Sequence, residues 1–160
     1  MSLKQKLIEH VRENGPMTVA EYMAACLYDP EDGYYATRPS IGGASADFLT
    51  APEASQMFGE LIGLWCAHEW DTLGKPAFNW IELGPGRGVL MQDALRATQR
   101  IDGMHDAASV VLVETSEPLR NEQAERVPLA DWIARIEDAP PGPSLIIANE
   151  FFDCLPIRQF

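Results

Sequence analysis

Basic residues are scarce in this sequence, which carries 12 lysines and arginines against 24 aspartates and glutamates and has a formal net charge of −12. A chain with this balance repels the phosphate backbone of a nucleic acid unless its few cations gather in one patch. No such patch appears along the sequence. We therefore expect no nucleic acid among the partners of this protein.

Cysteine is also rare. The three cysteines, Cys26, Cys66 and Cys154, are odd in number and far apart, so they suggest neither a disulfide framework nor a metal site. Each lies among apolar neighbours, which is typical of a small buried side chain. The sequence thus predicts no metal and a reducing compartment.

Apolar runs long enough to cross a bilayer are absent. The first residues have neither the apolar segment of a secretion signal nor the arginine-rich, acid-poor character of a transit peptide. These absences predict no membrane span and a location in the bacterial cytoplasm.

The remaining composition is that of a globular protein, with 46% hydrophobic and 22% charged residues. A chain of 160 residues can bury one core, but it is short for an α/β enzyme with six or seven strands. One domain, complete or in part, is the simplest interpretation.

Residues 1–76 predict a helical segment that contains one long loop. Apolar residues recur at helical spacing from Leu3 to Val11, and Thr18 and Glu21 have the form of a capping box that opens a second helix. Residues 31–46 are rich in Gly, Ser, Pro and Asp, which indicates a loop. Loops of this length are often lids, although a plain connection is an equal alternative.

A third helix is expected from Ala51 to about Trp70. Thr50 and Glu53 have the spacing of a capping box, with a proline in the first turn. Apolar side chains then recur at helical spacing and predict the face that packs against a sheet: Met57, Phe58, Leu61, Ile62 and Trp65.

Residues 77–160 alternate between apolar runs and helical segments. The runs cover residues 78–83, 110–113 and 145–148, and segments with helical character cover 89–95 and 118–126. This alternation is typical of βαβ units with a parallel sheet. The predicted fold class is therefore α/β, with a Rossmann-like parallel sheet preceded by the helical segment, and the boundary is expected at 76/77.

A glycine-rich turn follows the first predicted strand and opens the next helix. Its glycines are Gly84, Gly86 and Gly88, so the spacing is G-x-G-x-G, and Glu82 precedes it. The dinucleotide pattern G-x-G-x-x-G brings a pyrophosphate to a helix N-terminus. The shorter pattern with a preceding acid suits a cofactor that carries an adenosine and an amino acid, whose ammonium group Glu82 could meet.

The second predicted strand ends in a carboxylate, Glu114. In nucleotide-binding βαβ units an acid at this place accepts hydrogen bonds from ribose hydroxyls. In an isolated strand, a final Glu would more often simply reach solvent. Because Glu114 lies one βα unit after the glycine turn, the binding role is favoured.

Three strings resemble one family: DFLTAPEASQMFGE at 47–60, ELGPGRG at 82–88 and ANEFFDCLP at 148–156. They are similar to the MidA family of class I S-adenosyl-L-methionine-dependent methyltransferases. That family includes a mitochondrial assembly factor that methylates an arginine of a respiratory complex I subunit. The resemblance implies S-adenosyl-L-methionine as cofactor, a protein as substrate and arginine N-methylation as the reaction.

The resemblance also implies a seven-stranded sheet of which this chain holds the first half. Family members are considerably longer, and the resemblance implies that this sequence stops just after the fourth strand of that sheet. We therefore expect the 160-residue chain to be inactive alone. Its last strand should stand as an exposed edge, which favours a homo-oligomer or other association.

Residues after the last predicted strand are the catalytic candidates. Asn149 and Glu150 loosely resemble the start of the N-P-P-Y/F string of amino-group methyltransferases, with Glu and Phe in place of the two prolines. Asn149 could accept a hydrogen bond from the target nitrogen, and Glu150 and Asp153 could pair with a guanidinium. Packing after a strand end is the plainer alternative for this segment.

The segment from Asp47 to Gln56 is expected to fold over the cofactor, with Thr50 or Glu53 near its amino-acid end.

Two other functions stay open. The chain could be an assembly or interaction module that keeps the fold and binds a partner. A nicotinamide-dependent oxidoreductase is disfavoured by the glycine spacing.

Overall fold

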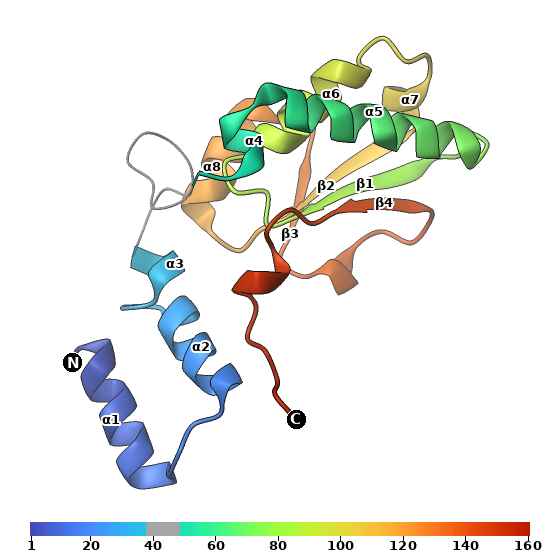
Figure 1. Cartoon of the computed structure of the whole chain (residues 1–160). Coiled ribbons are helices and arrows are strands. Elements are labelled where there is room, and N and C mark those ends of the chain that lie inside the picture. The colour runs from blue at the N-terminus through green and yellow to red at the C-terminus, as the bar shows by residue number, and fades with distance from the viewer. Residues whose placement is uncertain (38–48) are drawn as a thin grey trace. The chain divides into compact units, whose positions relative to one another are not determined.

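The computed structural model describes residues 1–37 and 49–160 (Figure 1). The larger part of the predicted lid loop therefore lies outside the described residues, as does Asp47. Contacts divide the chain into an N-terminal unit, Met1–Pro39 with Glu150–Phe160, and a sheet unit, Ser40–Asn149. The boundary expected at 76/77, between the helical segment and the α/β part, stays a prediction. Within the described ranges, no helix has both the length and the apolar character that a bilayer crossing requires.

The N-terminal unit contains helices α1 (Leu3–Asn14), α2 (Val19–Tyr28) and α3 (Tyr34–Thr37) and the 3-10 helix η2 (Phe152–Cys154). The capping box of α2 is confirmed, because the backbone N–H of Glu21 donates to the Thr18 hydroxyl oxygen at 3.2 Å and the Thr18 N–H donates back to the Glu21 carboxylate at 2.7 Å. The Tyr35 hydroxyl donates to Sγ of Cys154 at 2.8 Å. This bond ties the last residues of the chain to α3.

The sheet unit is built on four parallel strands in the order β3-β2-β1-β4. They are β1 (Phe78–Leu83), β2 (Ala108–Val113), β3 (Asp131–Ile133) and β4 (Ser144–Ile147). The predicted α/β class with a parallel sheet is confirmed. Strand β1 lies in the middle and is buried along its whole length, whereas β4 is an edge strand with Ile146 51% exposed.

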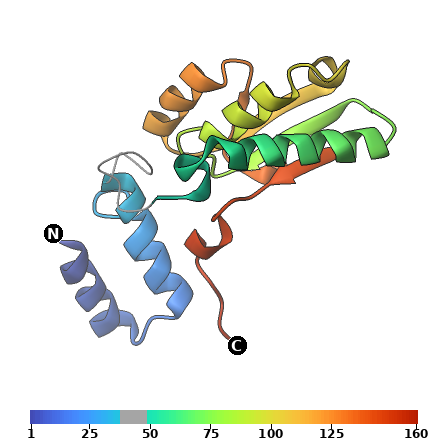
Figure 2. The same ribbon diagram turned by 45° about the horizontal axis from the view of Figure 1, so that its top comes forward.

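The helices of the sheet unit are α4 (Ala51–Ala54), α5 (Gln56–Thr72), α6 (Val89–Thr98), α7 (Met104–Ala107) and α8 (Glu117–Arg126), with a 3-10 turn at η1 (Ile136–Asp138). Helices α5 and α6 run side by side over one face of the sheet (Figures 1 and 2). The core between them and the strands includes Trp70, Trp80, Leu90, Met91 and Leu112. This packing holds the start of α6, and with it the glycine turn, against the end of β1.

The expected helix from Ala51 to Trp70 is two helices, because Ser55 between α4 and α5 has an extended backbone. The predicted packing face of the second helix is right only in part, since Phe58 and Ile62 pack against the core whereas Met57, Leu61 and Trp65 are exposed. The buried residues of this helix are small, with Trp70 the exception. A Cβ at Gly63 would lie 2.6 Å from Cα of Ala94. Because Gly63 has no side chain, α5 lies so close to α6 that larger side chains would not fit between the two helices at this point.

Candidate functional site

The glycine turn lies at the carboxyl end of β1 and leads directly into α6. Gly84, Gly86 and Gly88 have φ angles of +59°, +54° and +81°, in the left-handed region that favours glycine. A Cβ at Gly86 would meet no heavy atom within 4 Å in the part of the chain that the structure describes. The turn is therefore tight in its backbone and open on the side where a ligand could approach.

Glu82 is buried on β1, with 3% of its surface exposed. Its Oε2 atom has no hydrogen-bond partner among the described residues. Desolvation raises the pKa of this carboxyl to about 8, and the backbone N–H of Met91 offsets the rise in part. A buried carboxyl with a free oxygen, directly before the glycine turn, is suited to a cationic group of a ligand.

Glu114 follows β2 and is held in a fixed orientation. The backbone N–H groups of Thr115 and Ser116 both donate to its Oε1 at 2.7 Å. The Gly84 N–H donates to the carbonyl oxygen of Val113 at 3.1 Å, so the glycine turn and the end of β2 meet where the strands have their carboxyl ends. Open parallel sheets bind their ligands at these carboxyl ends.

Gln123 on α8 joins the glycine turn to Glu114, and no pattern in the sequence singles it out. It is fully buried, and its Nε2 donates to the Gly86 carbonyl oxygen at 2.6 Å and reaches Oε2 of Glu114 at 3.4 Å. Most of α8 is polar, so one more polar residue in it carries no signal before the fold is known. The structure thus adds a contact between the two predicted cofactor elements.

Arg87 connects the glycine turn to α4 and α8. Its Nη1 lies 3.5 Å from Oε2 of Glu53, and its Nε donates to Oε2 of Glu122 at 3.0 Å. The capping box predicted for Thr50 and Glu53 does not form, because the Glu53 carboxylate lies at Arg87 and the Thr50 side chain makes no capping bond. Thr50 is the N-cap residue of α4 through its backbone. A cofactor role for Thr50 and Glu53 stays a prediction.

The catalytic candidates follow β4. Asn149 is half-buried at the end of the sheet unit, and Glu150 and Asp153 are exposed in the N-terminal unit. Glu150 has a φ of +48°, which is uncommon for a residue other than glycine and often marks a functional turn. The Cys154 thiol lies 3.6 Å from the carbonyl oxygen of Glu150. The catalytic role of these residues stays a prediction.

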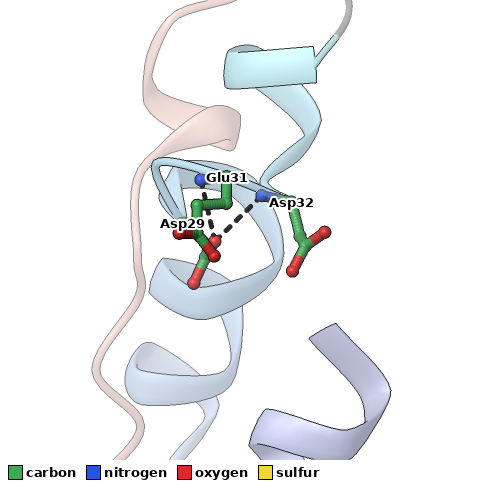
Figure 3. A group of neighbouring side chains, drawn as sticks. All are labelled: Asp29, Glu31 and Asp32. Atoms are coloured by element: carbon green, nitrogen blue, oxygen red, sulfur yellow. Dashed lines mark hydrogen bonds between the residues drawn. The ribbon is translucent and has the colours of Figure 1, made fainter. Parts of the chain in front are cut away.

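The N-terminal unit contains a group of three acidic side chains (Figure 3). The carboxylates of Asp29, Glu31 and Asp32 have oxygens within 4.8 Å of one another. The ammonium group of Lys6 pairs with all of them at 2.9 to 3.1 Å. Asp29 also accepts the backbone N–H groups of Glu31 and Asp32, which closes the turn after α2. These contacts make the group a structural turn and give no support for a metal.

Comparison with known proteins identifies the kind of molecule that shares these features. The model of one family, described as "Putative S-adenosyl-L-methionine-dependent methyltransferase", matches residues 61–160. Mitochondrial proteins named protein arginine methyltransferase NDUFAF7 are 40% identical in Mus musculus and in Homo sapiens, over 96% of this chain and 41% of each relative. The homologue of Drosophila melanogaster is 39% identical over 99% of this chain and 41% of its own length.

Solved structures agree in fold. A structure from Burkholderia thailandensis bound to S-adenosyl-homocysteine matches with a TM-score of 0.77 and 25% identity, over 96% of this chain and 42% of that one. The chain thus spans about two fifths of the length of the relatives it matches. The expectation of a bacterial cytoplasmic location is wrong by this comparison, because the curated relatives are mitochondrial proteins of eukaryotes.

Proposed function

Because this chain belongs to the family of S-adenosyl-L-methionine-dependent methyltransferases whose model matches residues 61–160, we propose that its glycine turn binds S-adenosyl-L-methionine. We propose further that the protein transfers the methyl group to an arginine of a protein substrate. The names of the curated relatives support arginine as the target. They also favour an enzyme over a module that only binds a partner. A subunit of respiratory complex I is the substrate that the sequence resemblance suggests.

The residues of the turn fit this cofactor. Glu82 offers a buried carboxylate oxygen that has no partner among residues 1–37 and 49–160, which suits the ammonium of the amino-acid part. Oε1 of Glu114 is occupied by two backbone N–H groups, whereas Oε2 has one long contact at 3.4 Å and can accept from ribose hydroxyls. Gly86 leaves the approach to the backbone open. The observation that carries the proposal is that this turn and Glu114 meet at the carboxyl ends of the neighbouring strands β1 and β2.

The cofactor, when bound, supplies a methyl group on a positively charged sulfur, which a nucleophilic nitrogen can attack in line. The protein's task is then to position the nitrogen and to exclude water. A guanidinium is protonated near neutral pH and has to lose a proton around the transfer step, and in this proposal the carboxylate of Glu150 or Asp153 accepts that proton. In this proposal Asn149 accepts from the target nitrogen. Glu150 and Asp153 pair with the guanidinium and hold its orientation.

A methyl-transfer assay tests the proposed reaction. Because the 160-residue chain is expected to be inactive alone, the assay uses a protein of the relatives' full length that contains it. With labelled S-adenosyl-L-methionine and a mitochondrial extract, this protein should yield methylarginine in a protein fraction, identified by mass spectrometry. Asn149→Ala should reduce the yield while leaving cofactor binding in place, because Asn149 is assigned to the target and not to the cofactor. Methyllysine in place of methylarginine, or an equal yield from the variant, would contradict the assignment.

A further inference from the structure

Gln123 is a buried polar residue whose side-chain amide is bonded at both ends. It has no exposed surface, and it lies on α8 beside the glycine turn. Its Nε2 donates to the Gly86 carbonyl oxygen at 2.6 Å, and its Oε1 accepts from the indole N–H of Trp132 at 2.8 Å. A buried amide is tolerated in a protein interior when it is satisfied in this way.

The partners of this amide determine its orientation. The indole N–H of Trp132 can only donate, and the carbonyl oxygen of Gly86 can only accept. Turning the amide over would set donor against donor and oxygen against oxygen. Nε2 of Gln123 therefore points at the glycine turn and at Oε2 of Glu114, 3.4 Å away.

Packing reinforces these bonds. A Cβ at Gly88 would lie 3.3 Å from Cγ of Gln123, so the side chain rests directly on the last glycine of the turn. Gln123 thus touches the turn at Gly86 and Gly88 and also reaches the acid at the end of β2. It spans the two parts of the proposed site that come from different βα units.

We propose that Gln123 is a positioning residue for the cofactor. It holds the glycine turn and the Glu114 carboxylate in the mutual placement that an adenosine group requires, and Trp132 holds Gln123. The inference rests on the proposed function, since the ligand is the cofactor assigned there. It predicts a loss of affinity for any ligand that carries the adenosine, even though Gln123 itself is covered by the turn.

Calorimetric titration of the 160-residue chain with S-adenosyl-homocysteine and, separately, adenosine tests this role. Gln123→Met keeps the length of the side chain and removes both hydrogen-bonding ends. It should weaken both ligands about tenfold or more, the usual consequence of losing buried hydrogen bonds that order a site. Trp132→Phe removes only the donor that orients the amide, and it should weaken both ligands by a smaller factor.

Two control variants separate positioning from general stability. Thr98 is fully buried in α6, and its hydroxyl donates to the Ala94 carbonyl oxygen at 2.9 Å. Thr98→Val should lower the melting temperature without changing either affinity. Gln99→Met makes the same chemical change at an exposed glutamine and should change neither property. If Gln123→Met bound both ligands as wild type does, or lost no more affinity than Thr98→Val, the inference would be overturned.

Hydrogen exchange gives a readout that needs no ligand. The Gly88 N–H donates to the Pro85 carbonyl oxygen at 2.8 Å within the turn, and the Gly84 N–H donates to Val113. Both amides should exchange faster in Gln123→Met and in Trp132→Phe than in the wild type. Unchanged exchange in a folded variant would contradict the positioning role. If the two amides exchanged faster in the variants but the wild type bound no cofactor, the positioning role of Gln123 would stand and only the proposed cofactor would be refuted.

Discussion

The guanidinium Nη1 of Arg87 lies 3.5 Å from Oε2 of Glu53, which places a residue of α4 beside the glycine turn. The two residues are 34 positions apart in the sequence, and each lies in one of the strings that resemble the family. A contact between them agrees with the expectation that the segment around Glu53 lies near Gly86. It also makes Arg87 the link through which α4 can affect ligand binding.

Replacing Arg87 with glutamine should loosen α4 from the turn. Arg87 is only partly exposed, and it forms ion pairs with Glu53 and Glu122. The loss of an ion pair near the protein surface typically costs about 0.2–1 kcal/mol of free energy. We expect S-adenosyl-homocysteine to bind more weakly by a factor of up to about five. Arg96→Gln breaks a comparable pair with Glu60 between α6 and α5 and should leave the affinity unchanged. Equal losses in both variants would refute the link.

Glu82 should make stability depend on pH in an unusual direction. Burial raises its pKa from the ordinary 4.5 to about 8, so between these values the folded protein binds more protons than the unfolded chain. The free energy of unfolding therefore falls as pH rises from about 4.5 to about 8, with a limiting slope of about 1.4 kcal/mol per pH unit from this group. Glu82→Gln does not titrate, so its profile should be flatter across this window. Urea unfolding at several pH values measures the difference, and parallel profiles would contradict the burial argument.

Gly86→Ala should separate backbone strain from ligand clash. The φ of Gly86 is +54°, so a side chain costs roughly 1–2 kcal/mol, and its Cβ would point into open space that we assign to the cofactor. Gly74→Ala is the matched control, because Gly74 has φ +86° and open space around it but follows α5, away from the turn. Both variants should lose similar stability in thermal melts. Only Gly86→Ala should lose cofactor affinity, and equal affinities would show that the turn does not bind it.

Strand β4 should direct association between copies of the chain. It is the last strand in the sheet order, and Ile146 on it is 51% exposed. Exposed edges of this kind offer unpaired backbone groups to other chains. Ile146→Lys should shift sedimentation toward the monomer at equal concentration, because a charge on an edge opposes pairing. Identical sedimentation of variant and wild type would place any association elsewhere.

The sequence predicted elements whose pattern is local. Strand β1 was predicted over the same residues that form it, and the glycine turn follows it as expected. Strand β3 escaped notice because it has three residues and begins with Asp131. The capping box at Thr50 failed because Glu53 has a better partner in Arg87, which only the fold brings near.

The packing of α5 shows a second limit of sequence patterns. Large apolar residues at helical spacing indicated one face, yet apart from Trp70 the fully buried residues of α5 are small: Gly59, Gly63, Cys66 and Ala67. Close approach of two helices requires small residues, and a periodicity of large side chains cannot reveal that requirement. Gln123 was missed for a related reason, since its role depends on two segments that meet only in the folded chain.

Titration of the wild-type chain with S-adenosyl-L-methionine and, in parallel, with NAD tests the central claim most directly. Three features predict saturable binding of one S-adenosyl-L-methionine per chain and no binding of NAD: the G-x-G-x-G turn, the open approach at Gly86, and the Glu82 carboxylate oxygen, which no described residue contacts by a hydrogen bond. Saturation with NAD, or no heat with S-adenosyl-L-methionine from a chain that melts cooperatively, would contradict the assignment of the glycine turn.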